Sequence, residues 1–233
     1  MTLVLNCGNK PEGCLQSVTF SVDFHDMSTL TGTRRSWLDS FPAGSFVHVQ
    51  DVPGSSDAAR AALSRAAKRG SIVQIRRGLY YRGEMTRYGM THPTEVEIVH
   101  EVVGTTGVGP AGYAAARALG VTTQVPAKLE YSAVGPLPEN LPGVILYSRS
   151  NRARLRLNEP EIALLEVLRS WKTLVEGGWK ALVDAVRRLT SRGKLRIDKV
   201  QSAVRSEHNS AIREAFTRLI ESLQTGTPAA SVG

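Results

Sequence analysis

The sequence is poor in cysteine, in aromatic residues and in long apolar runs. Its 233 residues include only two cysteines, Cys7 and Cys14, and 6% aromatic residues. The two cysteines form no CxxC pair and leave a zinc site short of ligands, so we assign them no chemistry. Apolar stretches such as 143–147 are far shorter than the roughly 20 residues that cross a membrane, and no secretion signal is recognisable. We therefore expect a cytoplasmic protein without a membrane partner.

The composition supports a folded core, and the charge is unevenly distributed. Hydrophobic residues make up 42% of the chain and charged residues 21%, which excludes wholesale disorder. The net charge is +8. Residues 30–90 carry ten basic groups against four acidic, residues 91–147 two against five, and residues 148–233 sixteen against nine. Two basic blocks favour a polyanionic partner, most simply nucleic acid, and a merely basic surface is the alternative.

The two ends of the chain are expected to lie outside the folded part. Residues 1–26 show neither helical nor strand periodicity, and Met27 is an alternative to Met1 as the physiological start. We expect residues 1–28 to be a disordered or non-native extension and residues 224–233 to be a flexible tail.

The first basic block predicts a helix with a basic outer face. After a helix over residues 33–41 and an extended piece over 46–49, Ser55-Ser56-Asp57 supplies an N-cap and a first-turn acid for a second helix that runs to about Arg69. Its small apolar residues recur with helical spacing and define a buried face. The outward positions are then Arg60, Ser64, Arg65 and Lys68.

A β-hairpin with two arginines at its tip is predicted directly after this helix. Residues 71–75 and 79–81 are two β-rich runs on either side of Arg76-Arg77-Gly78. A capped helix followed by a basic-tipped hairpin is the order of a winged helix-turn-helix, in which the helix enters the major groove and the wing reaches phosphate or the minor groove. A solvated amphipathic helix beside a structural hairpin is the alternative interpretation.

The rest of the chain predicts a mixed domain that ends in helices. A helix is expected to start at His92-Pro93-Thr94, with Pro93 at the first helical position, and another over 113–119. A small sheet from runs 127–133, 144–148 and 152–157 should follow, then further helices from 158 onward, one of them capped by Asp198. In the third run, Arg152, Arg154 and Arg156 alternate with apolar residues and predict a basic stripe. His100 with Glu97 and Glu101 finds no matching ligand set, so no metal is expected. The fold class is α+β: a winged helix-turn-helix over residues 29–90, then a mixed α/β domain with a helical C-terminal part over residues 91–223.

Two motifs carry a family resemblance. The run AALSRAAKRGSIVQIRRGLYY and the later run GYAAARALGVTTQVPAKLEY resemble the AbiEi family of antitoxins from type IV toxin-antitoxin systems, over roughly residues 33–157. The segment 120–128 is the more specific of the two signals. The resemblance implies an N-terminal winged helix that represses its own operon through promoter DNA and a C-terminal domain that neutralises a nucleotidyltransferase-like toxin. It further implies DNA contacts from Ser56, Arg60, Ser64, Arg65, Lys68, Arg76 and Arg77. One departure is that residues 49–53 leave little room for the first helix of the helix-turn-helix.

An enzymatic alternative remains open. Gly107, Gly109 and Gly112 form a literal GxGxxG, and Lys128 follows in a Val-Pro-Ala-Lys run that echoes the lysine strand of protein kinases. Some antitoxins that this chain resembles have been proposed to phosphorylate their toxins, so an atypical serine/threonine protein kinase using ATP and Mg is the alternative. Pro110 removes one amide from the loop, and no motif that holds magnesium and a base is present. We therefore expect a binding protein without cofactor or catalytic residues. A transcription regulator with a ligand-sensing C-terminal domain is a third interpretation.

Overall fold

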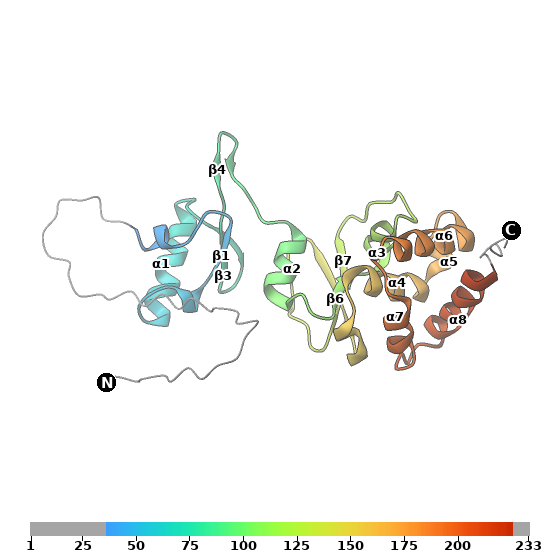
Figure 1. Cartoon of the computed structure of the whole chain (residues 1–233). Helices are drawn as coiled ribbons and strands as arrows, with labels where there is room; N and C mark the ends of the chain where they lie inside the picture. The colour runs from blue at the N-terminus through green and yellow to red at the C-terminus, as the bar shows by residue number, and fades with distance from the viewer. Residues whose placement is uncertain (1–35, 226–233) are drawn as a thin grey trace, which may run out of the picture. The chain divides into compact units, whose positions relative to one another are not determined.

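The computed structural model describes residues 36–225, and these residues form an α+β structure (Figure 1). Three small sheets are present in this part of the chain: a three-stranded sheet, a two-stranded hairpin and a second three-stranded sheet. The helices follow mainly from the second sheet onward. The described residues from Trp37 onward belong to one compact unit, and the division at residue 90 stays a prediction. Cys7, Cys14 and the alternative start Met27 lie outside the described residues.

The first sheet and α1 confirm the predicted capped helix and hairpin. Strands β1 (Ser45–His48), β3 (Leu79–Arg82) and β2 (Val73–Arg76) lie in the order β1-β3-β2, and both pairings are antiparallel. Helix α1 (Ser56–Lys68) packs its apolar side on this sheet through a core shared by both elements. The core residues are Leu38, Val47, Val52, Ala59, Leu63, Ala66, Ile72 and Tyr80.

The two segments before α1 are shorter than full α-helices. The helix expected over 33–41 is a 3-10 helix, η1 (Trp37–Ser40), and residues 33–35 lie outside the described part. A second 3-10 turn, η2 (Val49–Asp51), occupies the short segment before α1. This agrees with the lack of room noted in the sequence.

A projecting hairpin follows the first sheet and was not expected from the sequence. Strands β4 (Met85–Thr86) and β5 (Gly89–Met90) pair antiparallel around Arg87-Tyr88 (Figure 1). The turn is closed by the Thr86 hydroxyl, which donates to the carbonyl of Gly89 at 2.7 Å. Gly89 has a φ of +111°, which a residue with a side chain rarely adopts.

The second sheet differs from the predicted one in its third strand. Strands β7 (Leu129–Val134) and β8 (Val144–Arg149) are present as expected and pair in parallel, while β6 (Val108–Pro110) pairs antiparallel with β7. Residues 152–157, predicted as a strand, instead form the 3-10 helix η3 (Arg152–Arg156). The prediction of a basic stripe is therefore wrong, because Arg154 is 1% exposed and pairs with carboxylates inside the protein.

Helices α2 (Glu95–Val103) and α3 (Gly112–Leu119) flank β6 in the chain. Thr94, not Pro93, is the N-cap of α2, and Glu97 completes a capping box. Pro93 therefore precedes the helix instead of opening it. The left-handed Gly120 ends α3, with a φ of +70°.

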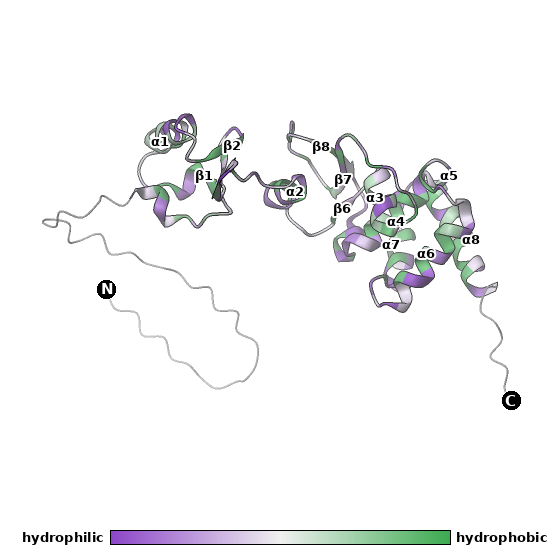
Figure 2. Cartoon of the chain, turned by 90° about the horizontal axis from the view of Figure 1, so that it is seen from above, coloured by the Kyte–Doolittle hydropathy of each residue, from purple (hydrophilic) through white to green (hydrophobic). Residues whose placement is uncertain are grey.

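The C-terminal helices surround the largest core of the described residues. Their hydrophobic sides meet in this core (Figure 2), and the helix over 159–169 is buried all round from Glu161 to Leu168. Asp198 lies within the first turn of its helix, whose N-cap is Arg196, so the predicted cap at Asp198 is wrong. Within residues 36–225, no helix combines the length and apolarity needed to cross a membrane. The helices are α4 (Glu159–Arg169), α5 (Trp171–Leu174), α6 (Gly178–Ser191), α7 (Ile197–Val204) and α8 (Ser210–Thr225).

Candidate nucleic-acid interface

Helix α1 presents its basic side to solvent because its opposite side is buried. Ala59, Leu63 and Ala66 are at most 1% exposed, and they recur with the three- and four-residue spacing of one helix face. The Ser55 hydroxyl accepts from the backbone N–H of Ala58 at 3.3 Å and so begins the helix. Small residues on the buried side bring the α1 backbone close to the sheet.

The five predicted contact residues of α1 are all exposed. They are Ser56, Arg60, Ser64, Arg65 and Lys68. Arg60 pairs with Asp57 at 3.0 Å, and the two side chains remain 62% and 95% exposed. Exposed pairs of this kind typically contribute only about 0.2–1 kcal/mol, so Arg60 remains available to an anion. The structure shows no ion pair between Arg65 or Lys68 and any carboxylate of the described residues.

The β2–β3 hairpin places one of its two arginines at the exposed turn. Arg76 is the last residue of β2 and is half-buried, whereas Arg77 lies in the turn and is exposed. Gly78 completes the turn with a φ of +84°, which explains the glycine after the two arginines. Arg77 is therefore the residue that the hairpin offers most freely to a partner.

A hollow brings α1 and the hairpin together. It has a volume of about 580 Å³, and its lining includes Arg60 and Ser64 from α1 and Arg77 from the turn. Val49, Gln74, Gly78 and Tyr80 complete the lining, so no carboxylate lines it. Ser56, Arg65, Lys68 and Arg76 do not belong to the lining. Arginine forks and hydroxyls are the groups that bond phosphate oxygens and base edges, so the hollow can receive the edge of a nucleic acid.

Gln74 is a residue of this hollow that the sequence interpretation missed. It is exposed on β2 opposite Tyr80, whereas its neighbours Val73 and Ile75 are half-buried. Its place between two apolar residues of a strand is the signal that could have identified it. Glutamine side chains can bond adenine edges in the major groove, so Gln74 gives the hollow a further group capable of such a contact.

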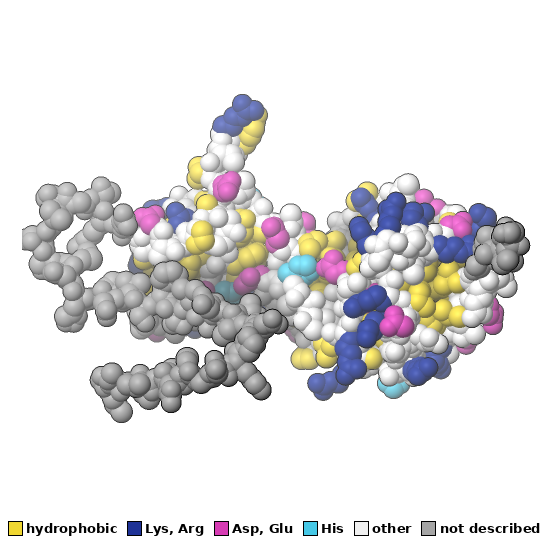
Figure 3. Space-filling view, in the orientation of Figure 1, with side chains coloured by type: hydrophobic (Ala, Val, Ile, Leu, Met, Phe, Trp, Pro, Cys, Tyr) yellow, Lys and Arg dark blue, Asp and Glu magenta, His cyan; other side chains and the backbone are white. Residues whose placement is uncertain are grey.

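The β4–β5 hairpin is a second basic tip that the sequence interpretation missed. Figure 3 shows basic side chains at the end of this projection. The guanidinium of Arg87 lies over the ring of Tyr88 at 4.6 Å, and Tyr88 is 84% exposed. Arg82, by contrast, donates to the carbonyls of Leu38 and Phe41 and serves the fold.

The glycines of the kinase-like alternative are packed against protein atoms. A Cβ on Gly107 would come within 2.8 Å of the Leu155 side chain, and one on Gly109 within 2.8 Å of Ile162. A Cβ on Gly112 would overlap the carboxylate of Glu130, whose pKa is raised by burial. Lys128 is exposed and precedes β7. The close packing at all three glycines leaves little room for a phosphate where this alternative places it.

No metal centre emerges from the described part of the chain. No group of three His, Cys, Asp or Glu side chains is placed to hold an ion there. The Nε2 atom of His100 instead lies 3.0 Å from a carboxylate oxygen of Glu159.

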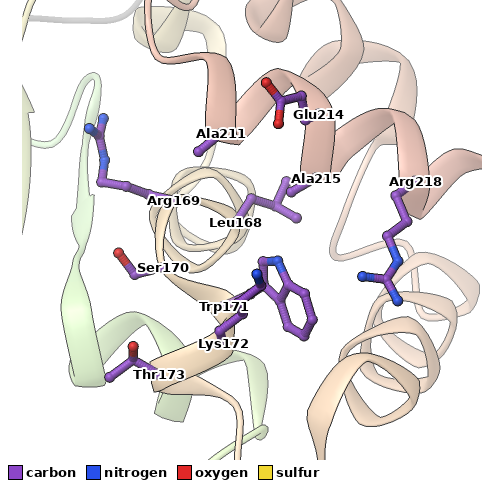
Figure 4. Close-up of a pocket in the computed structure, with 10 residues that line it drawn as sticks. All are labelled: Leu168, Arg169, Ser170, Trp171, Lys172, Thr173, Ala211, Glu214, Ala215 and Arg218. Carbon is purple, nitrogen blue, oxygen red and sulfur yellow. The ribbon is translucent and has the colours of Figure 1, made fainter.

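A second hollow lies among the C-terminal helices (Figure 4). It has a volume of about 490 Å³ and is lined by residues of α4, α5 and α8. The guanidinium of Arg218 lies 5.2 Å from the Trp171 ring and 4.4 Å from that of Trp179, and the two rings are 4.8 Å apart. Arg169 extends away from Trp171 and Arg218 (Figure 4). The Trp171 side of this hollow therefore holds a cation–aromatic stack that is satisfied within the protein.

Comparison with known proteins finds a family of unknown function. Residues 35–138 match the family described as "Family of unknown function (DUF6088)". A search of the curated proteins found no match. Among solved structures, the chain is similar to the crystal structure of the RV2827C protein from Mycobacterium tuberculosis, with 16% identity and a TM-score of 0.49 over 81% of this chain and 74% of that one. The matched family region contains both the hollow between α1 and the hairpin and the segment 120–128.

Proposed function

We propose that this protein binds double-stranded DNA through α1 and the β2–β3 hairpin in the manner of a winged helix. The supporting observation is the hollow in which Arg60 and Ser64 of α1 meet Arg77 of the hairpin turn without a carboxylate in the lining. An α-helix with its side chains is about 10–12 Å across, which matches a major groove about 12 Å wide. In this arrangement α1 enters the groove and Arg77 reaches the phosphates at its edge.

The order of the elements supports the same proposal. A strand, a helical turn, a helix and a two-stranded hairpin follow one another, and the first strand pairs with the second hairpin strand. A winged helix presents its recognition helix and wing on one side of such a sheet. Here a single 3-10 turn, η2, takes the place of the first helix of a helix-turn-helix before α1 begins.

A proposal for the biological role rests on the family resemblance of the sequence. We propose that the protein is an antitoxin of the AbiEi type that represses its own operon with the DNA-binding part and neutralises a nucleotidyltransferase-like toxin with the remainder. The support is the segment 112–131, which forms α3, a well-held loop and the start of β7. The loop is fixed to Glu176, whose carboxylate accepts from Thr122 Oγ1 at 2.7 Å and from the Thr123 N–H at 3.1 Å.

The DNA-binding proposal is tested by the salt dependence of binding. Fluorescence anisotropy with a duplex from the region upstream of the gene gives the dissociation constant over a series of KCl concentrations. The logarithm of the binding constant falls with the logarithm of the salt concentration, and each lost phosphate contact reduces the steepness of this fall by about 0.9. The double variant Arg76→Ala with Arg77→Ala should therefore reduce the steepness by one to two times that amount. Arg60→Ala and Arg65→Ala should instead reduce the preference for the upstream duplex over a scrambled one, by about 1–3 kcal/mol per lost base contact.

A charge-matched control separates groove contacts from net charge. Arg192→Ala with Arg205→Ala removes two exposed cations from the C-terminal helices and should leave the slope almost unchanged. Equal slopes for the wild type and the hairpin variant, or equal losses in the hairpin and control variants, contradict the proposed interface.

A further inference from the structure

Charged side chains from β8, η3, α4 and the segment after α7 form an ion cluster with more positive than negative charges. Arg149 donates to Glu166 through Nε at 2.8 Å and through Nη2 at 2.6 Å. Arg154 donates to Glu166 at 2.5 Å and to Glu207 at 2.6 Å. Arg169 is the third cation, with its Nε 3.8 Å from Glu166. Three guanidinium groups thus share two carboxylates.

Two nitrogen atoms of this cluster are buried without an acceptor. They are Nη2 of Arg154 and Nε of Arg169. Arg154 is only 1% exposed, so solvent reaches little of its guanidinium. Buried donors are paired in the great majority of native structures, and an unpaired one indicates a missing partner such as a water or an ion. These two N–H groups can each donate to one more acceptor, and the cluster contains three positive charges against two negative ones.

The pKa of Arg169 is lowered, which agrees with an excess of positive charge in the cluster. Burial lowers its pKa, and the nearby charges of Arg149 and Arg154 lower it further, while Glu166 acts in the opposite direction. An added anion beside Arg169 would relieve this repulsion.

A small polar pocket opens beside the cluster. It has a volume of about 210 Å³ and is lined by Arg149 and Arg169 together with residues at the end of β8 and before α8. Arg169 lines both this pocket and the tryptophan hollow, and its side chain extends away from Trp171 and Arg218 (Figure 4). Glu207 is the one acid in the lining, and its Oε1 already accepts from Arg154 and Asn151. Asn209, which precedes α8, also lines the pocket and places a helix N-terminus there.

We propose that this pocket binds a small oxyanion of the phosphate type, held by Arg149 and Arg169. Arginine forks suit the tetrahedral oxygens of phosphate, and charge-assisted hydrogen bonds are the stronger kind. The volume lies below the roughly 300–1,000 Å³ of pockets that enclose drug-sized ligands, so it fits a single phosphate group and not a whole nucleotide. The inference does not depend on the proposed DNA-binding function, because none of these residues belongs to α1 or the β2–β3 hairpin.

Titration of the full chain with inorganic phosphate at constant ionic strength tests the proposal. Calorimetry should show saturable binding, and the melting temperature should rise with phosphate, because a ligand that binds only the folded state stabilises it. A phosphate monoester, glycerol 3-phosphate, is titrated in parallel. Comparable affinity indicates that the pocket accepts the terminal group of an ester, and preference for inorganic phosphate indicates the free ion.

The decisive variant is Arg169→Gln. It should weaken phosphate binding about tenfold or more, which corresponds to the loss of one hydrogen bond to a charged group. In phosphate-free buffer its melting temperature should equal or exceed that of the wild type, because it removes a half-buried cation that faces the like charges of Arg149 and Arg154. A purely structural arginine would instead lower the melting temperature with and without phosphate.

Two further variants complete the test. Asn209→Asp retains a residue that caps helices well and places a carboxylate at the pocket, so it should also weaken phosphate binding. Arg192→Gln removes an exposed cation elsewhere and should bind as the wild type does. Absence of saturable binding to the wild type, or equal affinities in the Arg169→Gln and Arg192→Gln variants, overturns the proposal.

Discussion

Arginine residues of similar appearance in the sequence have opposite roles in the structure. Arg60 and Arg77 are exposed and line a hollow without carboxylates, which leaves them available to a partner. Arg154 and Arg149 are drawn into the protein by Glu166, and Arg196 pairs with the buried Glu161 at 2.7 Å. A guanidinium that is buried must be paired, because removing a charge from water without compensation costs several kcal/mol.

At the residue scale, we predict that Glu166 makes a pH-dependent contribution to the free energy of unfolding. Burial raises its pKa, but the hydrogen bonds and charges of Arg149 and Arg154 outweigh burial, and the net pKa lies below the ordinary 4.5. A carboxyl whose pKa is lower in the folded state stabilises the protein above the unfolded pKa of about 4.3, and this stabilisation is lost as the pH falls through the folded pKa. Urea unfolding at a series of pH values measures the effect.

The variant Glu166→Gln should lose about 3 kcal/mol of unfolding free energy at pH 7, because it removes the carboxylate that Arg149 and Arg154 share and leaves the buried Arg154 with Glu207 alone. Its unfolding free energy should also fall less than that of the wild type as the pH is lowered from about 5 through 4.3 and below. Glu139→Gln, which alters an exposed carboxylate, is the control. A variant that keeps the wild-type pH dependence would show that Glu166 does not carry it.

At the scale of secondary-structure elements, the sequence around α1 contains a signal for the start, the buried face and the end of this helix. An N-cap, a buried face of small residues and a left-handed Gly70 with φ +71° all lie within or next to the helix. The break between α4 and α5 depends instead on surroundings, since Ser170 has a φ of −144° in a stretch that continues the helical pattern of the sequence. Local patterns therefore predict where α1 lies, whereas neither a glycine nor a proline marks the end of α4 at Ser170.

We predict that the cap of α1 contributes measurably to stability. Ser55→Ala removes the hydroxyl that accepts from the N–H of Ala58 and should lower the unfolding free energy by about 1 kcal/mol. Ser55→Asp keeps an acceptor at the same position and should retain most of that stability. Denaturant unfolding of the three proteins measures the difference, and equal losses in both variants would contradict the role of the cap.

At the scale of the whole molecule, the proposed roles require different partners for different parts of the chain. The exposed cations of α1 and the hairpin turn suit a duplex, whereas the C-terminal helices bury a large apolar core and present a mixed surface. A masking antitoxin needs only surface complementarity, while a phosphorylating one needs a nucleotide site. The packed state of Gly107, Gly109 and Gly112 favours masking.

We therefore predict that the toxin forms a stable complex without nucleotide. This protein, purified, and a co-expressed nucleotidyltransferase-like toxin, its proposed partner, should elute together from a sizing column in the absence of ATP and magnesium. Labelled ATP should leave no label on the toxin, and Lys128→Ala should neutralise as the wild type does. Labelling that disappears in Lys128→Ala would support the kinase alternative instead.

The sequence predicted the elements whose signals are local. The capped helix ending near Arg69, the hairpin around Gly78 and the strands β7 and β8 are confirmed, because caps, turn glycines and β-rich runs act over a few residues. The sequence missed β6, whose three residues include a glycine and a proline, and it missed the Arg87-Tyr88 hairpin. Such short strands depend on a partner strand and carry almost no periodicity of their own.

Alone, the sequence determined the α+β class, the basic surface of α1 and the cationic turn of the hairpin, since these follow from residue types and spacing. Tertiary structure decided which charges are available. The alternation of Arg152, Arg154 and Arg156 with apolar residues satisfies a strand pattern, yet Arg154 finds carboxylates on α4 and after α7, far away in the sequence. The free energy of burying a charge depends on partners that only the folded chain brings together, and no local pattern records them.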